Sequence, residues 1–182
     1  MRRKLKQIHH ELKLTLVYVT HDQVEALTFA EKVLVMTRGR TVQVGSASDL
    51  FERPQHTFVG HFIGSPGMNF LPARGVEGGI EVAGHRLTMP RGGLPAAEAF
   101  KLGVRPEYVT LAAAGSAGAV AGNVTQAQDI GTYWLLTARV GADQVVRARL
   151  SPEQAIPKVG DAVWLKIVGE HTCFYKDEEL IG

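Results

Sequence analysis

The sequence predicts an α/β segment followed by a small all-β antiparallel barrel or sandwich. Residues 1–64 alternate helical spacing with short apolar runs, which is typical of helices covering a parallel sheet. Residues 65–182 instead carry short β-rich runs separated by Gly, Pro, Ser and Asp. Only four of the 20 glycines precede residue 65. The Gly64-Ser65-Pro66-Gly67 turn cluster therefore marks the expected boundary between domains at 1–64 and 65–182.

The first four elements follow from apolar spacing. Residues 14–20 are apolar and β-branched, which favours a strand buried on both faces of a parallel sheet. The helices on either side of it show spacing of three and four residues. In chain order we expect a helix through Leu5, Ile8 and Leu12, a strand over 14–20, a helix over 22–31 and a buried strand over 33–36.

Turn and capping residues predict the rest of the first segment. Arg38 and Gly39 can turn the chain into a hairpin with a strand over 41–44. Ser46 and Asp49 have the spacing of a capping box, which predicts a helix that Pro54 interrupts. An apolar stripe then predicts one more helix before the boundary, through Phe58, Val59 and Phe62.

The pattern of the second segment predicts six or seven short strands, which imply a small barrel or sandwich. Val146, Ala148 and Leu150 alternate with polar neighbours, so one face of that strand should be buried. Pro106 fixes its own φ and pushes Arg105 to extended geometry. We expect Arg105 and Glu107 to pair across this bend, with a ligand contact as the alternative. The predicted strands cover 80–87, 102–111, 120–127, 133–140, 144–150 and 162–170.

Composition excludes several classes of protein. The 20 Lys and Arg against 18 Asp and Glu leave a net charge of only +2, which is too small for a nucleic-acid signature. One cysteine, Cys173, excludes an internal disulfide framework, and we expect it to be a core or edge residue. The adjacent His9 and His10 point to different helix faces, so we expect no metal site. With no membrane span or signal peptide in the pattern, a cytoplasmic protein is expected.

One histidine carries the functional hypothesis. In the run VYVTHDQVEA at 17–26, His21 would sit at the carboxyl end of a strand, where open α/β sheets bind ligands. This run resembles the switch region of ATP-binding-cassette ATPases. By that resemblance His21 is the switch histidine that contacts the γ-phosphate; the alternative is a strand-end histidine that caps the next helix. The resemblance continues through AEKVLVM at 30–36, DLFERP at 49–54 and FVGHFIGSPGMNFL at 58–71, the last being similar to importer ATPases of the maltose and sn-glycerol-3-phosphate type.

The sequence lacks the other parts of a nucleotide site. It has no G-x-x-x-x-G-K-[ST] phosphate loop and no Ser-Gly-Gly-Gln signature, and no Mg²⁺-holding Asp-Glu pair precedes His21. We therefore expect the C-terminal part of an ATPase subunit that is inactive alone. The intact subunit, by resemblance, uses ATP and Mg²⁺ to drive solute uptake. It would be a cytoplasmic protein at the inner face of the membrane, bound to permease subunits.

The second segment resembles the accessory TOBE barrel, of oligonucleotide/oligosaccharide-binding (OB) type, that follows the ATPase domain in these importers. LGVRPE at 102–107 and GDAVWL at 160–165 carry that resemblance. It implies the end of a P-loop ATPase domain followed by an OB-fold-like barrel. It also implies a symmetric homodimer through the barrel and the junction residues Met68, Asn69 and Phe70, and possible binding of a regulatory protein or small effector.

Two alternatives remain open for the barrel. A stand-alone barrel of this type could bind an oxyanion such as molybdate. Trp134 and Trp164 could stack on sugars or bases, although their apolar surroundings favour packing in the core. Nucleic-acid binding is disfavoured, because residues 65–182 carry a net charge of −1.

Overall fold

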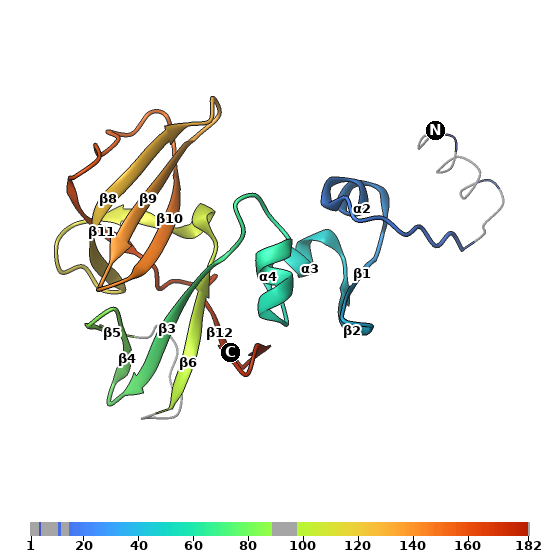
Figure 1. Ribbon diagram of the computed structural model, residues 1–182, viewed down its shortest axis with the longest axis horizontal. Helices are drawn as coiled ribbons and strands as arrows, with labels where there is room; N and C mark the ends of the chain where they lie inside the picture. The colour runs from blue at the N-terminus through green and yellow to red at the C-terminus, as the bar shows by residue number, and fades with distance from the viewer. Residues whose placement is uncertain (1–3, 5–10, 12–14, 89–97, 182) are drawn as a thin grey trace.

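The computed structural model describes residue 4, residue 11 and the ranges 15–88 and 98–181 (Figure 1). The expected helix through Leu5, Ile8 and Leu12 lies outside these residues. Within the described residues, two β-sheets and a hairpin account for most of the regular structure; one short α-helix precedes the hairpin, and two more lie between the hairpin and the sheets. Among the described residues, no helix is long and apolar enough to cross a membrane.

The predicted strand over 14–20 is wrong. Its described part forms no strand, and Val17 and Val19 are 82% and 90% exposed. A strand buried on both faces needs hydrogen-bonded neighbours, and no described strand pairs with this segment. The following helix is confirmed as α2 (Gln23–Phe29). Its N-cap is Asp22, whose side chain accepts a hydrogen bond from the Glu25 N–H at 3.0 Å.

The hairpin is confirmed, but its first strand is not part of a parallel sheet. Strands β1 (Val33–Thr37) and β2 (Arg40–Gly45) pair with each other in antiparallel fashion. Arg38 and Gly39 make the turn, both with positive φ, at 49° and 75°. Val35 lies on the buried face, whereas Leu34 and Val44 are directly opposite each other on an exposed face.

Both remaining helices of the first segment are confirmed. Helix α3 (Ala47–Glu52) begins with the expected capping box, in which Ser46 and Asp49 bond each other's backbone N–H groups. The chain leaves this helix at Pro54, and α4 (Thr57–Phe62) follows. His56 is the N-cap of α4 and accepts a hydrogen bond from the Phe58 N–H through Nδ1. These helices and β1 bury a small apolar cluster made of Val35, Leu50, Val59 and Ile63.

The second segment forms two antiparallel sheets. Two predicted strands are each divided by a turn: the run over 80–87 turns at Ala83 and Gly84, and the run over 102–111 is broken where Pro106 opens a 3₁₀ turn, η1 (Pro106–Tyr108). One sheet has the order β10-β9-β8-β11-β7 and the other the order β13-β12-β6-β3-β4-β5. The strands are β3 (Asn69–Val76), β4 (Gly79–Val82), β5 (His85–Thr88), β6 (Ala99–Val104), β7 (Thr110–Ala112), β8 (Ala119–Asp129), β9 (Trp134–Val140), β10 (Gln144–Leu150), β11 (Ala162–Lys166), β12 (Cys173–Lys176) and β13 (Glu179–Leu180).

One apolar core lies between these two sheets. Each sheet buries one face against the other, the usual way in which two sheets exclude water from their side chains. The expected alternation in β10 is confirmed, with Val146, Ala148 and Leu150 inside. Leu71, Ile80 and Leu102 meet them from the other sheet. Strands β3, β12 and β13 were not predicted from the sequence.

The C-terminal strand returns to the first segment. Figure 1 shows the chain end beside α4, and the backbone hydrogen bonds agree. The Thr57 N–H donates to the Glu178 carbonyl at 2.9 Å, and the Leu180 N–H donates to the Gln55 carbonyl at 2.9 Å. The two segments therefore share a hydrogen-bonded joint, and the division at residue 64 stays a prediction.

Candidate functional site at the joint

Arg105 lies at the centre of the joint between the helices and the sheets. It directly follows β6, is 1% exposed, and its guanidinium lies 3.9 Å from the centroid of the Phe51 ring. Nε donates to the Phe51 carbonyl at 2.5 Å, Nη1 to the Ile63 carbonyl at 2.5 Å and Nη2 to the Leu50 carbonyl at 3.3 Å. One side chain thus caps the carboxyl ends of both α3 and α4.

Electrostatic attraction favours the placement of the Arg105 guanidinium at these helix ends. The last carbonyls of a helix have no partner within the helix and carry partial negative charge. Burial lowers the pKa of the Arg105 guanidinium, but arginine stays charged in proteins. The carbonyls of Leu50, Phe51 and Ile63 replace the water that this buried cation has lost. Arg105 therefore holds the helices and the sheets together, and its guanidinium is not available to bind a ligand.

The expected Arg105–Glu107 pair is wrong. Glu107 instead accepts a hydrogen bond from Arg149 Nη1 at 2.7 Å, and the Arg149 guanidinium lies 3.8 Å from the Tyr133 ring centroid. The reason is the 3₁₀ turn opened by Pro106, because residues two apart in such a turn do not share a face. Arg105 and Glu107 therefore contact different partners, on different sides of the bend.

Glu52 makes the second contact across the joint. Its Oε1 accepts a hydrogen bond from the Tyr108 hydroxyl at 2.7 Å, and its Oε2 lies 3.0 Å from His171 Nδ1. The Tyr108 and His171 rings stack with centroids 3.8 Å apart. Burial, and then the bond to Glu52, raise the pKa of Tyr108 to about 12. The last residue of α3 is thus held by two residues of the β-rich segment.

Strand β12 supplies the third contact. The Tyr175 hydroxyl donates to the Pro54 carbonyl at 2.7 Å, and burial is the main cause that raises the pKa of Tyr175. Cys173 is buried as expected, and burial likewise raises the pKa of its thiol, so the reactive thiolate is disfavoured. No local pattern in the sequence indicated the contact between Tyr175 and Pro54, because the two residues lie 121 positions apart.

The junction residues Met68, Asn69 and Phe70 make their contacts mostly with other residues of the same chain. Met68 and Asn69 are buried, and Asn69 bonds the backbone of Arg147. Phe70 is half-buried and packs against His61, with ring centroids 4.5 Å apart. A dimer contact here would rest on Phe70, so the expected homodimer through this junction stays a prediction.

His21 lies away from the joint. It is exposed on a bend, and the described residues just before it, 15–20, form no strand. The alternative of a helix-capping histidine is wrong, because the cap is Asp22. The role of His21 as a switch histidine stays a prediction. The residues around it do not fit a nucleotide by themselves: the Thr20 hydroxyl and the Asp22 carboxylate bond locally, to Glu25, and the sequence has no phosphate loop.

The tryptophans differ from each other. Trp134 packs against the main core, as expected. Trp164 is half-buried on the outer face of its sheet, beside His85.

Two protein families match the β-rich segment. The family described as the MalK OB fold domain matches residues 64–109, and the TOBE domain family matches residues 102–174. Together the two matches run from residue 64 to residue 174, within β12.

Relatives extend the match to the first segment. The chain is 37% identical over 176 residues to an sn-glycerol-3-phosphate import ATP-binding protein, UgpC, of Salmonella typhi, which covers 92% of this chain and 47% of that protein. It is 47% identical over 109 residues to the protein of the same name from Cereibacter sphaeroides, covering 60% of this chain and 30% of that protein. The chain thus spans less than half the length of these relatives.

A solved structure shows a partial likeness. The molybdate-bound cytoplasmic molybdate-binding protein ModG matches with a TM-score of 0.48 and 14% identity, over 59% of this chain and 94% of that one. This likeness carries no functional argument, so the oxyanion-binding alternative gains no support from it.

Proposed function

We propose that this chain, which belongs to the TOBE-domain family of importer ATP-binding proteins and corresponds to their C-terminal part, completes the ATP-hydrolysing subunit of a solute importer. The observation that carries the proposal is the match to the Salmonella typhi protein over 92% of the chain, including the helices that precede the barrel. The solute would be sn-glycerol 3-phosphate or a related polyol or sugar, because the relatives import that compound.

The joint supports a role in transmitting movement. A regulatory barrel can influence an ATPase only if the two move together. Arg105 and Glu52 tie the barrel to α3 and α4 through buried or half-buried contacts. Fixed contacts of this kind transmit a displacement of the helices to the sheets, because packed interiors deform little.

Nucleotide chemistry belongs to the intact subunit. ATP and Mg²⁺ would be held by a phosphate loop and an acidic pair, which this sequence does not contain. From this chain His21 would reach the γ-phosphate, and its exposure leaves it accessible to do so. The subunit would act at the cytoplasmic face of the membrane, bound to permease subunits and paired with a second copy of itself.

A chimera tests this proposal. The matching C-terminal region of the Salmonella typhi relative is replaced by this chain, and uptake of sn-glycerol 3-phosphate is measured in cells that lack their own subunit. We expect uptake to be restored and to fall at least tenfold in the His21→Ala chimera. Asp143→Asn, at an exposed turn residue, is the control and should leave uptake unchanged.

Two results would contradict the proposal. One is a chimera that accumulates and joins the permease but supports no uptake. The other is Mg²⁺-dependent ATP hydrolysis by the 182-residue chain alone at a rate above that of its His21→Ala variant.

A further inference from the structure

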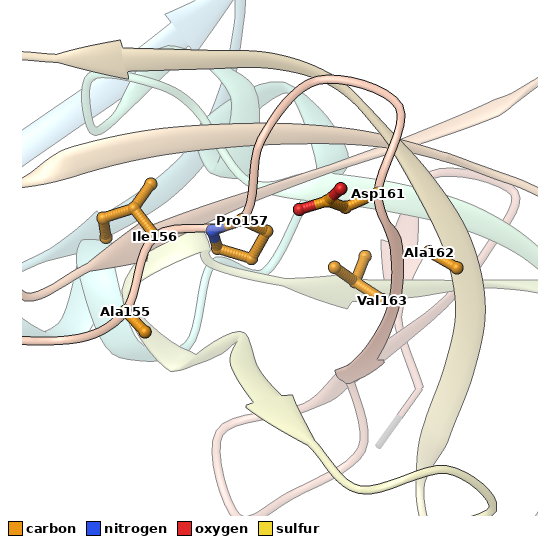
Figure 2. A pocket seen from close by; sticks show the side chains of 6 residues that line it. All are labelled: Ala155, Ile156, Pro157, Asp161, Ala162 and Val163. Atoms are coloured by element: carbon orange, nitrogen blue, oxygen red, sulfur yellow. The ribbon is translucent and has the colours of Figure 1, made fainter.

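Two hollows flank the start of β11. The first, of about 440 Å³, is shown in Figure 2. Its charged group is Asp161, which already accepts a hydrogen bond from the Lys158 backbone N–H at 2.8 Å. This hollow is therefore part of a turn and offers no uncommitted charge to a ligand. It is lined by Ala155, Ile156, Pro157, Asp161, Ala162 and Val163.

The second hollow, which we call the Trp164 groove, has different chemistry. It has a volume of about 400 Å³ and lies over β8, β9 and β11. Strand register places Asn123 directly opposite both Arg139 and Ala162, so these three side chains share the outer face of the sheet. Ala121 and Trp164 are opposite each other two residues along, and therefore lie on the same face.

The aromatic wall of the groove is held in place. The Trp164 ring meets the His85 ring edge to face, with centroids 5.4 Å apart and planes at 70°. His85 is itself fixed, because its Nε2 accepts a hydrogen bond from the Ala121 backbone N–H at 3.3 Å. Ala121 and Ala162 carry only methyl side chains, so the floor beside the half-buried indole stays open.

The polar groups of the groove are uncommitted. Arg139 and Asn123 are exposed, and among the residues that the structure describes neither side chain has a hydrogen bond or an ion pair. Two other barrel arginines are engaged: Arg149 bonds Glu107, and Arg105 bonds backbone carbonyls. A free guanidinium, a free carboxamide and a fixed indole thus converge on one hollow of ligand size.

We propose that the Trp164 groove binds a small phosphorylated polyol. The Arg139 guanidinium would take the phosphate, because its planar fork matches two phosphate oxygens. The Asn123 carboxamide would bond the hydroxyls, since it both donates and accepts. The carbon-bound hydrogens of the polyol would pack on the Trp164 indole. The inference concerns a ligand of the barrel and does not depend on the importer role.

Nuclear magnetic resonance on the 182-residue chain tests the groove. The ¹⁵N-labelled chain is titrated separately with sn-glycerol 3-phosphate, glycerol and inorganic phosphate. We expect saturable shifts at residues 121–123, 139–142 and 162–164 with the phosphorylated polyol, and at least tenfold weaker binding by each of the other two probes.

Variants assign the binding to named groups. Arg139→Met should weaken binding of sn-glycerol 3-phosphate at least tenfold, and Trp164→Phe about threefold. Arg40→Met, at an exposed position in the distant β1–β2 hairpin, is the matched control and should leave affinity unchanged. A dispersed spectrum shows that each variant is folded, and Arg139, being exposed, can be changed without opening the core.

Three outcomes would overturn the inference. The first is the absence of saturable shifts up to about 10 mM probe. The second is equal affinity for inorganic phosphate and the phosphorylated polyol, which removes any role for Asn123 and Trp164. The third is binding that Arg139→Met leaves intact, which places the ligand elsewhere.

Discussion

The side-chain amide of Asn69 pairs with the backbone of Arg147 as a neighbouring strand would. Asn69 Oδ1 accepts from the Arg147 N–H at 2.8 Å, and Asn69 Nδ2 donates to the Arg147 carbonyl at 2.9 Å. Asn69 begins β3 in one sheet, whereas Arg147 lies on β10 at the edge of the other. An edge strand leaves backbone groups unpaired, and here one side chain satisfies two of them and joins the sheets.

Replacing Asn69 should therefore weaken the barrel. Asn69→Ala removes both hydrogen bonds and leaves the Arg147 N–H and carbonyl without these partners, so we expect the free energy of unfolding to fall by about 2 kcal/mol. Urea unfolding followed by tryptophan fluorescence measures the loss. Asn123→Ala, at an exposed asparagine of the same segment, should change stability by less than about 0.5 kcal/mol. Equal urea midpoints for the two variants would show that the Asn69 bonds contribute nothing.

Arg105 should be irreplaceable by lysine. Lysine keeps the charge but lacks the fork that reaches the carbonyls of Leu50, Phe51 and Ile63 together. We expect Arg105→Lys to cost about 3 kcal/mol, since hydrogen bonds to charged groups are each worth roughly 1.5–3 kcal/mol and part of them is lost.

Hydrogen exchange distinguishes loosening of this joint from general damage. In Arg105→Lys the amides of α3 and α4 should exchange faster, relative to wild type, than those of β9, which lies away from the joint. Arg40→Lys, at an exposed arginine, serves as the control. Uniform acceleration across all elements would argue against a local role.

Local patterns were predictable and distant contacts were not. The capping box of Ser46 and Asp49 spans three residues, so sequence spacing alone identified it. The Arg38–Gly39 turn was found in the same way. Arg105 was singled out by its place before Pro106, but its partners are 42 to 55 residues away, and no short-range rule selects them over Glu107.

The failed strand over 14–20 shows a further limit. Apolar β-branched composition indicates that a segment suits a sheet, but a strand exists only where a neighbour pairs with it. Val17 and Val19 have that composition and lie exposed. The groove was missed for a related reason: Trp164 lies in an apolar pattern, and only the strand register reveals that Asn123 and Arg139 share its face.

Tyr108 should make stability sensitive to alkaline pH. Its pKa is raised to about 12 in the folded chain, from an ordinary 10.0, so the neutral hydroxyl is favoured on folding. This contribution is fully present below pH 10 and is lost as the pH rises through about 12.

The matched variant for this effect is Tyr108→Phe. At neutral pH it should lose about 1 kcal/mol with the bond to Glu52. Between pH 10 and 12 the unfolding free energy of the wild type should fall more steeply than that of the variant, as measured by urea titration at each pH. Tyr175 is present in both proteins and contributes equally. Parallel pH profiles would contradict the assignment to Tyr108.

Asp49 should give the opposite pH dependence at the acidic end. Hydrogen bonds from the Ser46 hydroxyl and backbone N–H lower the pKa of this exposed carboxyl below its ordinary 3.8. The contribution is therefore present above that value and is lost as the pH falls through the lower folded pKa. Asp49→Asn should be less stable than wild type at pH 7, and the difference should shrink below about pH 4, where the wild-type carboxyl also becomes neutral. Asp143→Asn, at an exposed turn, is the control, because its carboxyl has no hydrogen bond among the described residues. If the gap between Asp49→Asn and wild type stayed constant down to pH 3, the carboxylate would not be the group that stabilises the start of α3.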